Sequence, residues 1–294
     1  MALSHGTGIE RITLLAAGHS HCATVTEGGK LLLWGNNDFG QCGTGTADDS
    51  VLAATRCDSG ALADADVRVL FIACGAFHTV ALTSDGGVVV FGYNLHGQLG
   101  TGNNINQLTP TRLACATLDG VRIMGCAAGD YSTQLVSDDG RVFAMGQNDQ
   151  FVSNDGRVFA MGENNNGQPC TGDTTSVNTP TEIGAAHLGF APVAAVACGN
   201  NHTVSITRDE GNLFCWDEGD GGATGLGHTD DATTPQPVLG ALADARTTPQ
   251  PVLGALADAR TVRIVAGDGH SCALAEDGRV FAFGNCDGDW DGGL

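Results

Sequence analysis

The chain has 294 residues, 44 of them glycine, and its 33 acidic against 13 basic side chains give a formal net charge of −20. Such a charge repels nucleic-acid phosphates, and no apolar run approaches the ~20 residues that a membrane-spanning helix needs. We therefore expect neither nucleic acid nor membrane as a partner. We interpret most of the acidity as solvated turns, and the alternative is a face that attracts a basic partner.

The clearest predicted elements lie between residues 67 and 110. Apolar runs at Val67–Ala73, Thr79–Leu82 and Val88–Phe91 have the length of strands and are too short for stable helices. Asp85-Gly86 separates the second run from the third, and this dipeptide is typical of a tight hairpin turn. Pro110 then marks a segment that we predict to be an edge strand. The stretch is therefore an antiparallel meander.

The same pattern recurs along the whole chain, anchored on a glycine three residues before a histidine. Gly75 and Gly129 are 54 residues apart, and this is the underlying period once two tandem duplications are removed. We predict one repeat domain, residues 1–294, with modules at about 9–66, 67–120, 121–190, 191–261 and 262–294. The third module has Ser132 at the histidine position. The anchor residues are Gly18, His21, Gly75, His78, Gly129, Gly199, His202, Gly267 and His270.

Two segments are duplicated in tandem. Residues 136–148 return nearly unchanged at 152–164, and residues 233–246 return without change at 247–260. Because a small sheet has no place for an additional strand in register, we expect one copy of each pair to be displaced as a hairpin or loop.

A period in this range, built of strands and Gly-rich turns, is typical of radial or solenoid arrays. Residues 74–102 carry Gly75-x-x-His78-Thr79, an apolar run, Asp85-Gly86, a strand ending in Phe91-Gly92 and then GYNLHGQLGTG. This order of motifs resembles the regulator of chromosome condensation repeat family. The resemblance implies an all-β fold, a β-propeller of four-stranded blades, and seven blades is the usual number in that family.

The chain is shorter than such a propeller requires. Without the duplications it holds about five periods, so we expect about five blades and an incomplete or atypical propeller. We favour an open arc cut from a longer parent over a small closed ring, because residues 8–11 leave no room for the missing Pro-containing strand. The fourth module is the most degenerate, with Asp217 in place of the strand-ending glycine.

The repeated positions are assigned structural roles, and we predict no catalytic, cofactor-binding or metal-binding residue. Histidines at equivalent positions of different blades are too far apart to share one metal ion, so we expect each to bond local backbone. Asp85, Asp139, Asp155 and Asp277 are hairpin-turn residues. Glycines 92–102 serve tight turns, since no helix and no Lys follow to form a phosphate loop. His96 and His228, in loops that differ between modules, are the candidates for partner contact.

The eleven cysteines show no C-x-x-C spacing. Cys74 and Cys198 occupy a repeat position that is alanine elsewhere, which indicates small buried apolar residues. Free thiols are typical of a reducing compartment, the cytoplasm or the nucleus.

These observations favour a protein–protein interaction module, a non-catalytic scaffold or regulatory propeller that presents variable loops on a rigid frame. Two alternatives follow from the family resemblance. One is a guanine-nucleotide exchange factor for a Ran-like small GTPase, and the other is the propeller fragment of a larger ubiquitin ligase. The sequence matches neither a wedge-like insertion nor a ligase catalytic domain, and fold alone does not carry function.

Overall fold

The computed structural model describes residues 2–4, 9–47, 50–146, 158–162, 177–183, 193–199, 202–208, 211–217, 222–226, 232–238, 250–251, 260–267 and 269–284. These residues form antiparallel sheets of short strands, and they include two three-residue helical turns, Gly60–Leu62 and Ala116–Leu118. The all-β prediction is confirmed. The chain divides into two compact units, Met1–Gly189 and Phe190–Leu294, which we describe separately.

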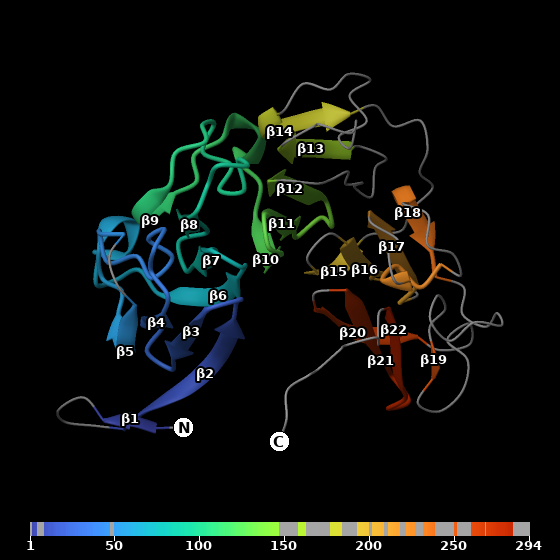
Figure 1. Ribbon diagram of the computed structural model, residues 1–294, viewed down its shortest axis with the longest axis horizontal. Helices are drawn as coiled ribbons and strands as arrows, with labels where there is room; N and C mark the ends of the chain where they lie inside the picture. The colour runs from blue at the N-terminus through green and yellow to red at the C-terminus, as the bar shows by residue number, and fades with distance from the viewer. Residues whose placement is uncertain are drawn as a thin grey trace. The chain divides into compact units, whose positions relative to one another are not determined.

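The first unit opens with two complete meanders (Figure 1). The first contains β2 (Ile9–Ala17), β3 (His21–Thr26), β4 (Leu31–Gly35) and β5 (Val51–Arg56), and the short strand β1 (Ala2–Ser4) pairs with β2. The second contains β6 (Val69–Cys74), β7 (His78–Thr83), β8 (Val88–Gly92) and β9 (Gln107–Arg112). The strands predicted between residues 67 and 110 therefore exist.

Turn chemistry sets the register of each meander. His78 lies opposite Gly92 at one end of the β7–β8 pair, and the turn at Asp85-Gly86 closes the other end. Gly86 has a φ of +81°, the left-handed conformation that this turn requires. Pro110 lies in the outer strand β9, where the pairing with β8 is irregular between Val90 and Gly92, so its missing N–H interrupts no regular ladder. We call the two ends of each sheet the histidine end and the hairpin end.

Neighbouring sheets pack face to face. All residues of β7 and β8 are buried, because alternate side chains point to opposite faces and both faces are covered. Ala81, Val89 and Phe91 pack against the first module. Val80, Val90 and Leu99 pack instead with side chains of the third module, such as Phe143. No single module could bury its apolar faces alone, which explains why the unit is repeated.

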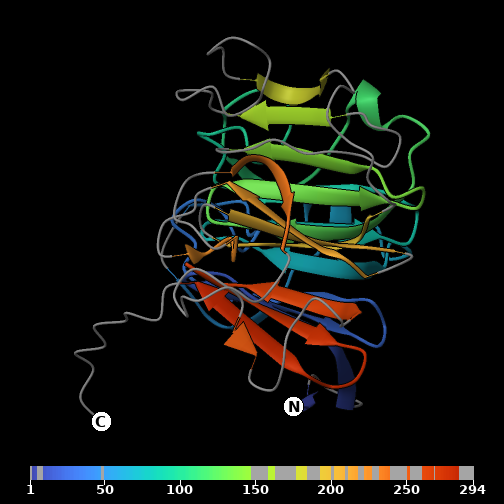
Figure 2. The same ribbon diagram turned by 90° about the vertical axis from the view of Figure 1, so that its right-hand side faces the viewer.

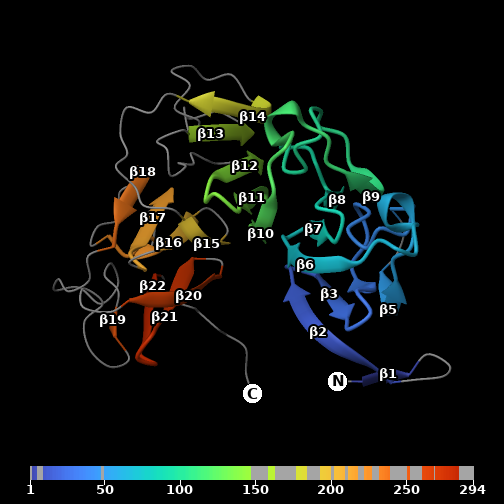
Figure 3. The same cartoon turned by 180° about the vertical axis from the view of Figure 1, so that it is seen from behind.

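The third module is divided between two sheets. β10 (Ile123–Ala128), β11 (Ser132–Ser137) and β12 (Val142–Gly146) form one sheet, and β13 (Val158–Gly162) pairs with β14 (Val177–Ile183) in another. β12 and β13 lie side by side (Figures 1 and 3). They are the two copies of the sequence VFAMG. Both copies are strands, they belong to different sheets, and the module's last strand pairs with the second copy. The two copies therefore do not share one regular sheet.

The second unit contains two four-stranded sheets. One consists of β15 (Val193–Cys198), β16 (His202–Thr207), β17 (Leu213–Asp217) and β18 (Ala232–Pro237). In the other, β20 (Thr261–Ala266), β21 (His270–Ala275) and β22 (Val280–Gly284) lie side by side (Figure 2), and β19 (Gln250–Pro251) is the outer strand beside β22. Val204, Phe281 and Phe283 belong to the core shared by these sheets.

The second duplication supplies both outer strands of this unit. In the first copy, Pro237 of β18 lies opposite Phe214. Its counterpart in the second copy, Pro251 of β19, lies opposite Phe281. Phe214 and Phe281 are each the second residue of their strands, so both copies pair in the same register. The expected displacement is therefore wrong for this pair, since an unpaired sheet edge accepts the additional copy.

Candidate functional site

Three of the repeated histidines connect their own module to the next module of the same unit. The Nε2 atom of His21 lies 2.9 Å from Oγ1 of Thr79, and Nε2 of His78 lies 2.8 Å from Oγ1 of Thr133. In the second unit Nε2 of His202 lies 2.7 Å from Oγ of Ser271. Each hydroxyl follows the anchor position of the next module. The expected bond to local backbone is therefore wrong for His21 and His78. In all three contacts the Ser or Thr of the G-x-x-H-[ST] motif is the histidine's partner from the neighbouring module.

The hydrogen bonds of Thr79 determine which nitrogen of His21 carries the proton. The Thr79 hydroxyl donates to the Gln41 carbonyl oxygen at 2.8 Å, so its oxygen accepts from Nε2–H of His21. Nδ1 of His21 and of His78 is buried and has no hydrogen-bond partner among the described atoms. A proton added there would be a buried donor without an acceptor, which is costly.

Burial keeps both rings neutral. His21 is 2% exposed and His78 is 0% exposed. Desolvation lowers the pKa of His21 to about 4, and desolvation, with a smaller contribution from nearby His21, lowers the pKa of His78 to about 3. These groups are therefore parts of the frame and are unsuited to acid–base chemistry near neutral pH.

The anchor glycine is required by the same packing. A Cβ added to Gly75 would overlap the ring of His78 and the carbonyl oxygen of Gly129 in the next module. At Gly18 and Gly199 the corresponding Cβ would meet the next module's anchor glycine in the same way. The spacing G-x-x-H thus brings the backbones of adjacent modules into contact beside a buried imidazole.

The remaining anchors differ. Ser132 is buried at the histidine position of the third module. Its side chain is too short to reach a hydroxyl of another module as the imidazoles of His21 and His78 do. His270, in the last module, is exposed. His228, a predicted partner contact, lies outside the described residues.

In the first two modules, asparagine and glutamine side chains hold the loop that follows the third strand. Nδ2 of Asn94 donates to the carbonyl oxygens of Asn103 and Ile105 at 2.8 and 3.1 Å, while its Oδ1 accepts from the Leu99 N–H at 2.8 Å. Asn37 makes equivalent bonds in the first module. Oε1 of Gln41 accepts from the backbone N–H of Phe39 at 2.9 Å, and Gln98 accepts likewise from His96 at 3.1 Å. The backbone of two residues with aromatic side chains is thereby fixed at the histidine end.

Six aromatic rings gather there and form what we call the aromatic surface. Phe77 lies 5.4 Å from Phe39, 6.1 Å from Tyr93 and 6.2 Å from Tyr131, measured between ring centroids. Tyr131 in turn lies 4.9 Å from His96. One ring is exposed and the others are half-buried. The cluster draws on three modules and comprises His19, Phe39, Phe77, Tyr93, His96 and Tyr131.

Sequence reasoning placed only His96 among the candidate contact residues. The four Phe and Tyr rings were missed because their repeat positions are not aromatic in every module. A signal was nevertheless present, since Phe77 and Tyr131 occupy the same position of successive modules, directly before the anchor histidine or its replacement.

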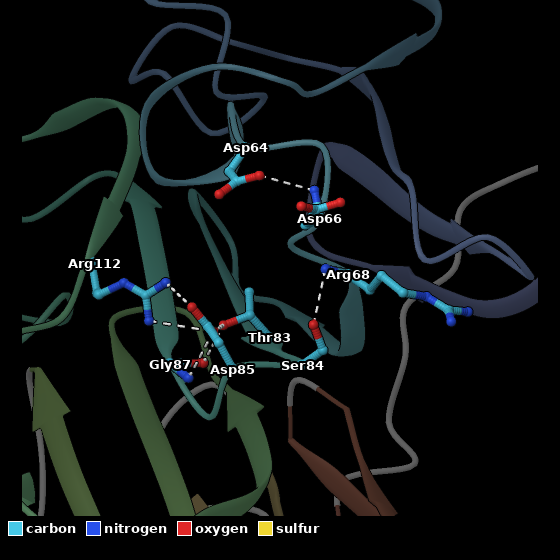
Figure 4. Close-up of polar contacts among 8 residues, drawn as sticks. All are labelled: Asp64, Asp66, Arg68, Thr83, Ser84, Asp85, Gly87 and Arg112. Atoms are coloured by element: carbon cyan, nitrogen blue, oxygen red, sulfur yellow. Dashed lines mark hydrogen bonds and ion pairs between the residues drawn. The ribbon is translucent and has the colours of Figure 1, made fainter.

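The hairpin end is polar and carries ion pairs. Asp85 accepts from the Thr83 hydroxyl at 2.6 Å and pairs with Arg112 at 2.5 Å (Figure 4). The guanidinium of Arg112, followed by the Thr83 hydroxyl, lowers the pKa of Asp85 to about 2. Arg68 N–H donates to the Ser84 hydroxyl at 3.1 Å in the same view (Figure 4). Asp139 and Asp277 repeat the turn interaction, so these carboxylates stabilise turns as predicted, and Asp155 lies outside the described residues.

The described cysteines of the first unit are free thiols, and Cys42, Cys57, Cys74 and Cys126 are buried. Burial raises the pKa of Cys42 to about 11 and that of Cys57 to about 12, and Cys74 is 8% exposed in the core between the first two modules. The part of the chain that the structure describes contains no group of three or more His, Cys, Asp or Glu arranged to hold a metal ion. It also contains no helix with the length and hydropathy to cross a membrane.

Face-packed, four-stranded antiparallel modules joined by buried histidines define a repeat protein of the β-propeller class. The regulator of chromosome condensation (RCC1) repeat matches residues 28–82, 85–136 and 155–206, more than half of the chain, and a second form of the repeat matches 69–98 and 262–287. The chain belongs to the RCC1 repeat family.

The chain is also similar in sequence or in structure to known proteins. The chain is 28% identical to the ultraviolet-B receptor UVR8 of Arabidopsis thaliana, over 93% of this chain and 53% of the receptor. It is 29% identical to the X-linked retinitis pigmentosa GTPase regulator homolog of Caenorhabditis elegans, over 93% of this chain and 23% of that protein. The structure of Prp20p from Saccharomyces cerevisiae is similar in fold, with a TM-score of 0.63 at 24% identity. The match includes 95% of this chain and 57% of the Prp20p chain. The chain thus spans about half or less of these curated relatives.

Proposed function

We propose that the chain is a protein–protein interaction module, a non-catalytic scaffold or regulator, and that its partner binds the aromatic surface. The observation that carries this proposal is the cluster of six partly exposed rings at one end of the first unit. Single exposed apolar residues are ordinary on a protein surface, whereas a contiguous aromatic patch is typical of a binding site.

The rigidity of the frame supports the same proposal. Phe39 and His96 are each tied through backbone N–H to a buried glutamine, Gln41 and Gln98, that is 0% exposed. A loop backbone that is already held in place loses little conformational entropy when a partner binds. The relatives include an ultraviolet-B receptor and, at 27% identity over 5% of its length, the human E3 ubiquitin-protein ligase HERC2. Proteins of such different activities share the repeat, which favours a role in recognition.

Differential capture tests the proposal. The wild-type chain and a Phe77→Ser/Tyr131→Ser variant would be immobilised and exposed to extract of the source cells, followed by quantitative mass spectrometry. Leu70→Ser is the matched control, because Leu70 is 57% exposed on β6, away from the cluster. We expect a protein that wild type and Leu70→Ser retain and that the double variant loses. Equal capture by all three chains would contradict the proposal.

Guanine-nucleotide exchange on a Ran-like small GTPase is a second candidate. It is favoured by similarity to a GTPase regulator homolog and by a fold shared with Prp20p, which has binding properties to Gsp1p and histones. The test is release of a fluorescent GDP from a Ran-like GTPase in the presence of the chain. Accelerated release that Phe77→Ser/Tyr131→Ser abolishes would support this candidate, and an unchanged rate would remove it.

A further inference from the structure

The aromatic surface has a geometry suited to cations. The centroids of its rings are 4.8 to 6.2 Å apart and neighbouring planes are tilted by 35° to 73°. Because no contact in the cluster is a parallel stack, the ring faces point in different directions. The face of an aromatic ring carries negative charge density and attracts ammonium and guanidinium groups, most strongly where several rings surround the cation.

Charge in the first unit is segregated between the two ends of its sheets. The segments that carry the rings, residues 18–20, 36–41, 75–78, 93–98 and 129–132, contain Asp38 and Asp130 and no Lys or Arg. Asp38 is exposed and Asp130 is half-buried. The histidine end of the described sheets therefore combines aromatic rings with carboxylates.

The basic residues of the same unit lie at the opposite end. Lys30 and Arg141 are in hairpin turns. Each remaining described basic residue of the unit lies beside a hairpin turn, because its backbone either bonds a residue of the turn or pairs with a residue near it. Strands of five or six residues separate the two ends by about 17–20 Å. Arg112 is already paired with Asp85 (Figure 4), so this end neutralises its own charge. The described basic residues of the unit are Arg11, Lys30, Arg56, Arg68, Arg112, Arg122 and Arg141.

We infer that the aromatic surface binds an arginine-bearing basic segment of a partner protein. This inference rests on the proposed interaction function and specifies the partner's chemistry. Guanidinium groups stack on aromatic faces and pair with carboxylates, which fits a surface of rings flanked by Asp38 and Asp130. The net charge of −20 attracts a basic segment from a distance.

The probe is a fluorescent twelve-residue peptide of alternating Arg and Gly, titrated against the full chain by fluorescence anisotropy at low salt and at 0.5 M salt. Peptides with Lys or Glu in place of Arg are compared at the same concentrations. We expect the Arg peptide to bind most tightly, the Lys peptide more weakly and the Glu peptide not at all. High salt weakens the binding because it screens the carboxylates.

Two matched pairs of variants locate the site. Tyr93→Leu retains apolar bulk and removes the ring, so we expect affinity for the Arg peptide to fall about five- to thirtyfold, the equivalent of a lost cation–π contact. Tyr93→Phe, which retains the ring, binds nearly as wild type. Asp38→Asn weakens binding, and Asp66→Asn, at an exposed hairpin-end carboxylate (Figure 4), has no effect. Circular dichroism establishes that each variant is folded.

Equal binding of the Arg and Glu peptides, or undiminished affinity of Tyr93→Leu, would overturn the inference. That result is distinguishable from failure of the proposed function. If the Arg peptide does not bind but a cellular protein is still lost from Phe77→Ser/Tyr131→Ser, the interaction function stands and only the basic chemistry of the partner is refuted.

Discussion

Mild acid should destabilise the first unit through its two buried histidines. The folded pKa values of His21 and His78, about 4 and about 3, lie below the ordinary value of 6.5. The unfolded chain therefore binds protons that the folded chain does not, and the stability present above pH 6.5 is lost as the pH falls toward the folded values. Each pH unit below 6.5 costs about 1.4 kcal/mol per ring, so at pH 5 each ring costs about 2 kcal/mol and the pair about 4 kcal/mol.

The assay is urea unfolding at pH 7 and pH 5, followed by circular dichroism. His78→Gln removes one of the two titrating rings, so the pH-dependent loss should fall by half to about 2 kcal/mol. Adding His21→Gln should remove the rest. Asp85→Asn is the control, because the pKa of Asp85 is about 2 and its carboxylate does not titrate between pH 7 and 5. Equal stability of the wild-type chain at both pH values would refute the reasoning.

Three further predictions concern the frame. Gly75→Ala should lower the free energy of unfolding by about 3 kcal/mol through overpacking. Gly86→Ala should lower it by only about 1 kcal/mol, because the added Cβ meets open space. Thermal denaturation measures both losses, and equal losses would contradict the packing argument. Thr79→Val should cost about 2 kcal/mol because it leaves Nε2–H of His21 buried without an acceptor, and Thr79→Ser should restore most of the loss. Deleting residues 247–260 leaves one outer strand for two sheets, so hydrogen exchange of β17 or β22 should accelerate, and unchanged protection in both would be the opposing result.

The elements of the fold could be predicted because their signals are local. Residues 79–82 and 88–91 flank an Asp-Gly turn, and this combination requires no knowledge of distant contacts to be interpreted as a hairpin. The partner of each histidine could not be found in this way. His21 and Thr79 are 58 residues apart, and only the packing of one module on the next brings them together. The chain does contain the signal, since a hydroxyl follows each anchor position from Thr79 onward.

The duplications show a second limit of local reasoning. The rule that a sheet has no place for an additional strand in register is sound for a complete sheet, and it failed because one sheet lacked its outer strand. β19 occupies that edge although it precedes β20–β22 in the chain, whereas β18 follows β17. Both copies carry the same Gln-Pro pair and meet the same strand position. Pairing is decided by which backbone groups are free, and the order of the strands along the chain does not restrict it.

Within each module, some positions make the contacts that hold modules together and others do not, and the aromatic surface includes a position of the second kind. Gly75, His78 and Thr79 make contacts that the repeat needs wherever it occurs, so their counterparts change little along the chain. Phe77, which stands between Gly75 and His78, is half-buried in the aromatic surface, and its side chain has no polar atom with which to bond a neighbouring module. Its position is occupied by Ser20, Tyr131, Asn201 and Gly269 in the other modules. A position that is structurally unconstrained and surrounded by constrained ones can vary without loss of the fold. Aromatic residues at this position in two successive modules therefore require an explanation outside the packing of the repeat, and binding of a partner provides one.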